Sequence, residues 1–164
     1  MAVGEDEFRA AMRRWPTGVS VLTARSERGH HGMTANSFTA VSLDPVLILV
    51  CVEKAARFHA AVEATGAFGI SVLADDQEDI ARWFALRGRP YEAAEFADFG
   101  NHEAPSGVLL LDNSLATLEC RTTAVHDGGD HSILVAQVVT AEVLRPDAGP
   151  LLYFDGDYGS LVRG

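Results

Sequence analysis

Apolar and polar residues alternate along most of the chain in short runs, and these runs predict a protein built mainly of strands. The run 46–52 is apolar at every position, which is typical of a strand that is buried on both faces. By contrast, the run 33–41 is rich in Thr and Ser and carries little apolar bulk. The strand-like runs are 19–25, 33–41, 46–52, 67–73, 115–126, 132–144 and 151–154.

Short helices are predicted between these strands. The first places Phe8, Met12 and Trp15 on one helical face. The second is rich in alanine and is followed by Gly66, a residue type that commonly ends a helix. The predicted helices cover residues 7–15, 55–64 and 77–85.

Turn signals decide how the strands connect. Glycine-containing turns at 26–30 and 127–130 predict hairpins, and the regular βαβ alternation of a doubly wound fold is missing. The segment 87–105 holds two Gly and two Pro, which predicts a loop lying over the body as a lid or a dimer contact. We therefore expect a mainly β protein, an antiparallel barrel with peripheral short helices, forming a single domain over residues 1–164.

Composition and charge narrow the range of partners. The 164 residues include 13 basic and 23 acidic side chains, so the net charge is −10. This charge argues against a nucleic-acid partner and against an anionic membrane. The N-terminal residues lack the apolar core of a signal peptide, and no apolar run is long enough to span a bilayer. We therefore expect a cytoplasmic protein.

Several strong motifs are absent from the sequence. It contains no GxGxxG, no GxxxxGK[ST], no GxSxG and no HExxH. Cys51 and Cys120 lie in strand-like runs and form no CxxC pair, so we expect two reduced, buried thiols. No metal site is expected.

Small polar residues from Thr34 to Ser37 form the most informative stretch. Small side chains let a flat ligand approach the backbone, and their polar groups can hydrogen-bond a heterocycle or a phosphate. An edge strand whose polar face meets water explains the same composition. The residues after the apolar run 46–52 favour the ligand-binding interpretation, because a predicted helix begins there. The helix N-terminus, Lys54 and Arg57 together suit a phosphate, although Lys54 and Arg57 also fit a solvated helix surface.

Two later segments add candidate chemistry. His131 follows the turn at Gly129-Asp130, where a histidine can hydrogen-bond a carboxamide or move a proton. Tyr158 stands between glycines in the run 155–159 and can stack on a planar ring. The plain alternatives are a solvated turn histidine and a tyrosine that covers the edge of the core.

The run Met-Thr-Ala-Asn-Ser-Phe at 33–38, followed by Ser-Leu-Asp-Pro at 42–45, resembles the flavin-binding segment of the flavin reductase-like, FMN-binding split-barrel family. The Gly-Asp-His triplet at 129–131 and the run 153–159 match the same family in the same order. The resemblance covers nearly the whole chain. It implies a Greek-key-like split barrel that acts as a homodimer, with flavin sites near the subunit interface.

The resemblance also implies an activity, the transfer of hydride from NADH or NADPH to FMN or FAD. Reduced flavin would then diffuse to a separate flavin-dependent monooxygenase. His131 would be the catalytic residue, and His131 and Tyr158 would meet the nicotinamide. The flavin would contact Thr34, Ala35, Asn36, Ser37, Ser42, Leu43, Cys51, Val52, Lys54, Ala55, Ala56, Arg57 and Phe58.

Three choices stay open at this level. Many relatives carry small hydroxyl residues where this chain has Ala55 and Ala56, so the choice between FMN and FAD is open. A 2′-phosphate needs a basic pocket, for which Arg87 and Arg89 are the candidates, and we favour NADH. The competing functions are a flavin-storage protein of the same fold, a haem- or pyridoxal-phosphate-binding split barrel, and an acidic interaction module without a ligand.

Overall fold

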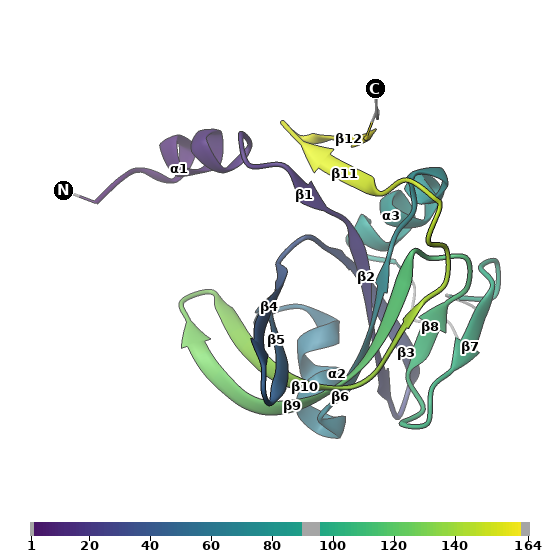
Figure 1. Cartoon of the computed structure of the whole chain (residues 1–164). Coiled ribbons are helices and arrows are strands. Elements are labelled where there is room, and N and C mark those ends of the chain that lie inside the picture. The colour runs from purple at the N-terminus through teal and green to yellow at the C-terminus, as the bar shows by residue number, and fades with distance from the viewer. Residues whose placement is uncertain (1, 90–95, 162–164) are drawn as a thin grey trace.

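A seven-stranded antiparallel sheet curls into a barrel and forms the body of the molecule (Figure 1). The computed structural model describes residues 2–89 and 96–161. The order of the strands is β3-β2-β6-β9-β10-β5-β4, so the sheet begins at β3 and ends at β4. This confirms the expected mainly antiparallel split barrel. The strands are β2 (Ser20–Ser26), β3 (Gly29–Ala35), β4 (Phe38–Leu43), β5 (Val46–Glu53), β6 (Ala67–Val72), β9 (Ala116–Gly128) and β10 (His131–Val143).

The single strand predicted over 33–41 is wrong, because the chain forms two strands there. β3 pairs with β2, whereas β4 pairs with β5, so the two strands lie at opposite edges of the sheet. Asn36 and Ser37 join them. The Ser37 hydroxyl donates to the Cys51 carbonyl at 2.7 Å, and the Cys51 N–H donates to the Ser37 carbonyl at 3.3 Å. These bonds fix the connection between β3 and β4 against β5. The chain therefore passes from one edge of the sheet to the other at the polar run Thr34–Ser37.

Two small sheets accompany the barrel. β1 (Thr17–Gly18), β11 (Leu151–Phe154) and β12 (Asp157–Ser160) form one of them, and β7 (Asn101–Glu103) and β8 (Leu109–Leu111) form the other. β11 and β12 make a hairpin whose turn residues, Asp155 and Gly156, have φ angles of 54° and 91°. The hairpin puts the tyrosines Tyr153 and Tyr158 opposite each other.

The helices occupy different positions relative to the barrel. α2 (Arg57–Thr65) packs against the barrel through Phe58, Ala61 and Val62, and it ends at Gly66, which has a left-handed φ of 68° as expected. α3 (Glu78–Ala85) follows the one-turn helix η1 (Asp75–Gln77) and lies over β3. α1 (Glu5–Met12) stands away from the barrel (Figure 1). No helix in the described ranges is long and apolar enough to cross a membrane.

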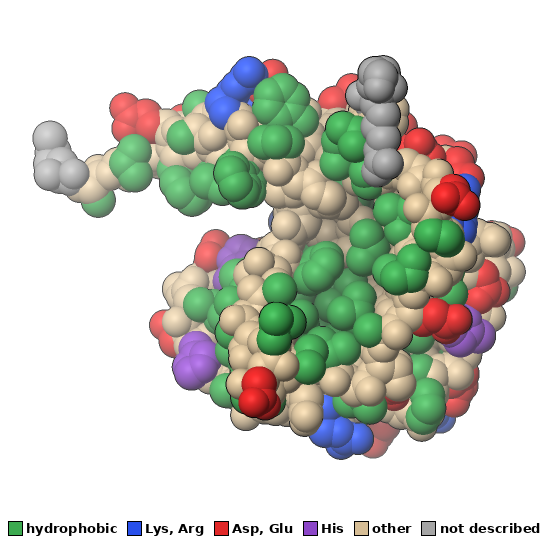
Figure 2. Space-filling view, in the orientation of Figure 1, with side chains coloured by type: hydrophobic (Ala, Val, Ile, Leu, Met, Phe, Trp, Pro, Cys, Tyr) green, Lys and Arg blue, Asp and Glu red, His purple; other side chains and the backbone are tan. Residues whose placement is uncertain are grey.

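α1 differs from its prediction in a way that bears on assembly. It begins at Glu5 and ends at Met12, so Trp15 lies beyond the helix. Phe8, Met12 and Trp15 are 56%, 48% and 67% exposed, and no residue of α1 is buried. Figure 2 shows apolar side chains on α1 and in the hollow between α1 and the barrel. Large apolar surfaces of this kind are typical of interaction sites.

β5 is buried on one face only within the chain. Ile48, Val50 and Val52 point into the main core, together with Phe58 and Phe68. The alternate positions Leu47, Leu49 and Cys51 are half-buried, and Val46 is exposed. The prediction that both faces of β5 are buried is therefore wrong for a single chain. No element in the described ranges fully covers the second face.

Cys120 is expected to be chemically inert in the folded protein. Its side chain is 1% exposed, and burial raises the pKa of its thiol to about 12, with a further contribution from Glu119. Because the thiolate is the reactive form, a thiol reagent at neutral pH should not modify Cys120. In a Cys51→Ser variant we expect no reactive thiol before unfolding and one after unfolding in guanidinium. Rapid labelling of the native variant would contradict this burial.

Candidate functional site

A cavity of about 430 Å³ opens between β3, the N-terminus of α2 and the segment that follows α3. Its volume is within the usual range for small-molecule sites. Its wall carries three guanidinium groups, the carboxylate of Glu53 and the imidazole of His31, and most of the other lining residues are small or apolar. The lining residues are His31, Gly32, Met33, Thr34, Glu53, Ala55, Ala56, Arg57, Phe58, Phe84, Ala85, Leu86, Arg87, Gly88 and Arg89.

The start of α2 supplies one wall. β5 ends at Glu53, and the Ala56 N–H donates to the Glu53 carbonyl at 2.9 Å as the chain turns into the helix. Ala56 is the N-cap residue and has no side-chain oxygen to satisfy the first helical N–H groups. A helix start of this kind favours an anion through its N–H groups and its dipole. The wall can therefore accept a phosphate close to the backbone.

Two arginines tie the opposite wall to the barrel. The Arg89 guanidinium donates to the Gly32 carbonyl at 2.5 Å and to the Trp83 carbonyl at 2.9 Å, and it lies 4.9 Å above the ring centroid of Phe84. The Arg57 guanidinium donates to the Arg89 carbonyl at 2.6 Å. This network links α2, β3 and the segment after α3. It also concentrates two positive charges beside the cavity of an otherwise acidic protein.

His31 shares this end of the cavity. Its ring is 6% exposed, and Nε2 lies 2.9 Å from the Ser26 hydroxyl. Burial lowers the pKa of His31, and the charges of Arg57, His30 and Arg89 lower it further. The ring is therefore neutral at neutral pH in the protein alone.

A second, smaller hollow of about 240 Å³ adjoins the cavity through the shared residues Thr34 and Ala85. The Thr34 hydroxyl donates to the Ala81 carbonyl at 2.6 Å, which fixes this side chain between β3 and α3. Burial raises the pKa of Tyr158, so its phenol stays protonated. The lining of the hollow is Val19, Thr34, Ala35, Asn36, Ala85, Tyr153 and Tyr158. The structure thus brings Tyr158 to the run Thr34–Asn36, from the other end of the sequence.

The β9–β10 hairpin places His131 beside the end of β5. His131 is the cross-strand partner of Glu53, and its Nδ1 lies 2.7 Å from Asp130. The hydrogen bond to His131 lowers the pKa of Asp130. The Glu53 carboxylate reaches the Arg87 guanidinium at 3.4 Å, and both residues line the cavity. Glu53 therefore connects the cavity to the strand position of the histidine.

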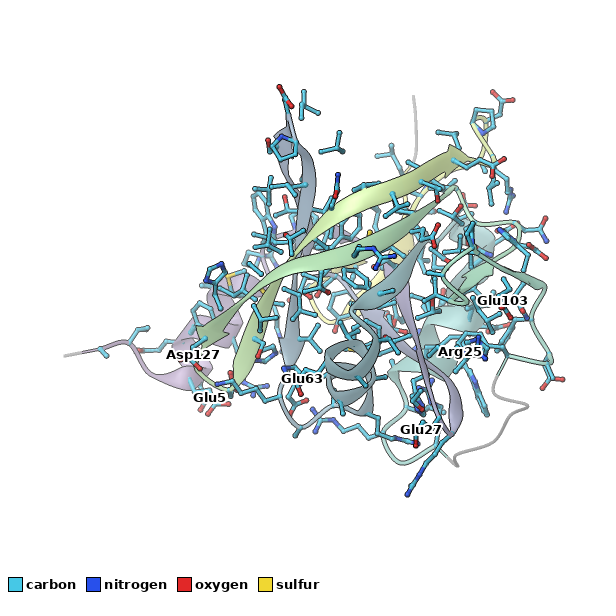
Figure 3. The ribbon with its side chains drawn as sticks, turned by 90° about the horizontal axis from the view of Figure 1, so that it is seen from below. Glu5, Arg25, Glu27, Glu63, Glu103 and Asp127 are labelled. Atoms are coloured by element: carbon cyan, nitrogen blue, oxygen red, sulfur yellow. The ribbon has the colours of Figure 1, made fainter. Side chains whose placement is uncertain are left out.

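Lys54 points to the hairpin instead of the cavity. Its ammonium pairs with Asp127 and donates to the Gly129 carbonyl at 2.7 Å. The hydrogen bond from Lys54 lowers the pKa of Asp127. Asp127 lies at the tip of the β9–β10 hairpin, well away from the labelled Glu27 beyond the end of β2 (Figure 3). In this arrangement Arg57, and not Lys54, is the helix-proximal cation that faces the cavity.

Five other residues that were predicted to contact the flavin also lie outside the lining of both hollows. Ser42 and Leu43 are at the end of β4, where Leu43 is 89% exposed. Val52 points into the core, and Cys51 points to the half-buried face of β5. Ser37 is held by its bond to β5. Within one chain, the structure therefore separates a group on β4 and β5 from the residues that line the cavity.

Sequence reasoning missed part of the lining. His31, Gly32 and Met33 precede the polar run directly, and Phe84 to Gly88 close the cavity from α3 onward. A Cβ on Gly32 would lie 2.4 Å from the Phe84 ring, so glycine is needed for α3 to pack here. Arg87 and Arg89 could have indicated this part of the lining from the sequence. They were considered there only as candidates to bind the 2′-phosphate of NADPH.

Comparison with known proteins identifies the family of the chain. The model of the flavin reductase like domain matches residues 12–162. The chain belongs to this family. It is 38% identical over 156 residues to the NADH-dependent FMN reductase SmoA of Agrobacterium fabrum, covering 95% of this chain and 86% of SmoA. It is 34% identical to HsaB of Rhodococcus jostii, the reductase subunit of a flavin-dependent monooxygenase, covering 96% of this chain and 78% of HsaB.

The solved structures show the same fold in an enzyme of this kind. The NADH:FAD oxidoreductase SgcE6 of Streptomyces globisporus superposes with a TM-score of 0.91 at 35% identity, covering 99% of this chain and 98% of SgcE6. The relatives therefore include reductases named for FMN and for FAD, and the two structures share the barrel from end to end.

Proposed function

We propose that this flavin reductase family member catalyses the NADH-dependent reduction of FMN or FAD and releases reduced flavin to a separate flavin-dependent monooxygenase. The observation that carries the proposal is a cavity with a cationic end, formed by Arg57 and Arg89, that continues into a hollow lined by Thr34, Ala35 and Asn36. The named activities of SmoA, HsaB and SgcE6 support the same conclusion.

The residues present fit a flavin. Its phosphate would occupy the end of the cavity at Ala55, Ala56 and Arg57, where the helix start and the guanidinium groups favour an anion. Its ring system would extend along Thr34 and Ala35, whose small side chains allow backbone contact. Because neither Ala55 nor Ala56 offers a hydroxyl, the hold on the phosphate comes from N–H groups and arginine.

By the family resemblance, the nicotinamide would meet Tyr158 and His131. Within one chain Tyr158 lies beside Thr34, Ala35 and Asn36, whereas His131 lies beside Glu53 at the end of β5. A bound flavin supplies the acceptor for the hydride of NADH, and the protein contributes the orientation of the two rings. Asp130 orients the His131 ring through its 2.7 Å contact, so the other ring nitrogen can meet a carboxamide. Tyr158 stays protonated and packs on Tyr153, with ring centroids 5.4 Å apart.

We also propose that the active form is a homodimer. The apolar face of α1, the exposed Leu43 and the half-buried positions of β5 are surfaces that a second copy would bury. The continuous apolar run of β5 makes sense if its second face is covered by the partner. The same contact would bring Ser42, Leu43 and Cys51 toward a flavin at the interface. The cytoplasmic location stays a prediction from the sequence.

The variant His131→Ala is expected to lower turnover about 10- to 100-fold with little change in fold, because His131 is only half-buried on its hairpin and would position the nicotinamide alone. Steady-state kinetics and thermal unfolding measure the two effects. Full turnover together with an unchanged KM for NADH would remove His131 from the site.

The proposed activity is tested by following the near-ultraviolet absorbance of NADH with purified protein and added FMN, FAD or riboflavin, and then repeating the series with NADPH. We expect fast oxidation of NADH that depends on added flavin. A protein that binds flavin and oxidises neither nucleotide would instead be a flavin-storage protein.

A further inference from the structure

Lys54 is the single lysine of the chain, and the function proposed above gives it no role. It lies between the end of β5 and the start of α2. Its ammonium pairs with the Asp127 carboxylate and donates to the Gly129 carbonyl at 2.7 Å. Its backbone N–H donates to the Asp130 carbonyl at 3.0 Å. One residue therefore binds the tip of the β9–β10 hairpin at three points.

The tip of this hairpin has little packing to hold it. β9 ends at Gly128 and β10 begins at His131, so Gly129 and Asp130 form the turn. Gly129 has a φ angle of 80°, and a Cβ on it would meet no heavy atom of the described residues within 4 Å beyond its chain neighbours. The Asp130 side chain is 89% exposed. Because glycine gives the backbone wide conformational freedom, the bonds from Lys54 restrain a turn that would otherwise be mobile.

The orientation of His131 depends on the same turn. Nδ1 of His131 lies 2.7 Å from the Asp130 carboxylate. The hydrogen bond to His131 lowers the pKa of Asp130, and the charge of Lys54 acts in the same direction, so the carboxylate is ionised at neutral pH. An ionised carboxylate only accepts hydrogen bonds, so Nδ1 donates and Nε2 is left for a ligand. A displacement of Asp130 would therefore turn the ring of His131.

A phosphate contact is the competing role for Lys54, as the resemblance implied. The two hollows are lined by other residues, and Arg57 is the cation at the start of α2 that faces the larger one. The two roles have different consequences. Loss of a phosphate contact weakens the binding of FMN and FAD, whereas loss of the hairpin contact changes only the steps that depend on His131.

We propose that Lys54 is a positioning residue for hydride transfer. It holds the hairpin tip on the connection between β5 and α2, which fixes Asp130 and, through Asp130, the ring of His131. Lys54 itself touches neither the flavin nor NADH. The proposal rests on the proposed function, because it takes His131 to meet the nicotinamide.

The kinetic test compares Lys54→Ala, His131→Ala and the double variant in the full-length protein. We expect Lys54→Ala to lower kcat/KM for NADH about fivefold, the upper range for an exposed ion pair, and to change the dissociation constant of FMN less than about threefold. In the His131→Ala background the same substitution should lower kcat/KM less than about twofold, because Lys54 acts through the missing ring. Lys54→Arg keeps the charge and the donors and should recover most of the loss.

A second readout needs no flavin. Nitrogen-15 relaxation of the Gly129 and Asp130 amides in the protein alone reports the motion of the turn. In the wild type we expect order parameters of about 0.85, typical of rigid backbone, and in Lys54→Ala values below about 0.6. Amides in the middle of β10 should keep the wild-type values in both proteins.

Arg145→Ala is the matched control. Arg145 also pairs with an aspartate, Asp76, at 2.8 Å and donates to a backbone carbonyl, that of Asn113, at 3.0 Å, but it lies beyond the other end of β10. We expect this variant to keep the wild-type kcat/KM and the wild-type order parameters of the turn.

Three results would overturn the role of Lys54 and leave the reductase activity intact. They are unchanged order parameters in Lys54→Ala, an equal effect of this substitution with and without His131, and a loss of FMN affinity beyond about threefold, which would assign Lys54 to the phosphate. A wild-type protein that oxidises no NADH would overturn the proposed function together with this role.

Discussion

Substitution of Arg57 by Ala is expected to weaken the binding of FMN and FAD about 10- to 100-fold and to change riboflavin binding little. Arg57 starts α2, lines the cavity and is the helix-proximal cation that faces it. Hydrogen bonds to charged groups contribute about 1.5–3 kcal/mol, which corresponds to this range in affinity. The quenching of flavin fluorescence by the protein measures all three dissociation constants.

Two further variants make the Arg57 experiment specific. Arg57→Lys keeps the positive charge and should recover part of the affinity. Lys54→Ala removes the neighbouring cation, which the structure pairs with Asp127, and should change the affinity less than about threefold. An Arg57→Ala protein that loses riboflavin binding to the same degree would mean that Arg57 supports the cavity wall through the Arg89 carbonyl instead of binding phosphate.

Substitution of Trp15 by Glu is expected to dissociate the proposed homodimer. Trp15 is 67% exposed in the single chain, and buried aromatic anchors commonly carry 2 kcal/mol or more of an interface. The dimer dissociation constant should therefore rise by about 30-fold or more. Sedimentation velocity over a range of protein concentrations measures this change, and reductase activity should fall together with the dimer fraction.

Arg9→Gln is the control for the Trp15 variant. It lies on α1 as well, but it removes only an exposed pair with Glu5, which contributes less than about 0.5 kcal/mol. We expect it to leave the dimer unchanged. A wild-type protein that sediments as a monomer at every concentration would contradict the homodimer and leave the exposed face of α1 unexplained.

The sequence predicted the strands whose pattern is locally strong. The apolar run of β5, the glycine that ends α2 and the turn between β9 and β10 all appear in the structure where they were expected. Each of these features depends on neighbours in the sequence: a continuous apolar run, a left-handed residue, or a tight turn. Local rules are sufficient for such elements.

The β3–β4 region could not be predicted in the same way. A strand pattern says nothing about which strand is its partner, and a run over 33–41 has the same period whether it is one strand or two. The division depends on the bonds between Ser37 and Cys51, which are distant in sequence. The same limit applies to the outer face of β5, because burial by a second chain and burial within one chain produce the same apolar run.

The candidate site was predicted only in part. Of the residues that the resemblance implied as flavin contacts, Thr34, Ala35, Ala56 and Arg57 are among those that line the two hollows. His31 and Arg89 were not assigned to the flavin, because they join the site through contacts across the fold, such as the bond from Arg89 to the Gly32 carbonyl. Their positions depend on the packing of α3 on β3, and the spacing of residues along the sequence does not predict such a contact.

A single-turnover experiment without oxygen measures hydride transfer from NADH to the bound flavin directly. The protein with bound flavin is mixed rapidly with NADH, and the visible absorbance of the oxidised flavin is followed. We predict that the absorbance disappears in a fast phase and that this phase slows when the transferred hydrogen of NADH is replaced by deuterium. A flavin that stays bound and oxidised under these conditions would rule out hydride transfer and would make the protein a carrier of flavin instead of a reductase.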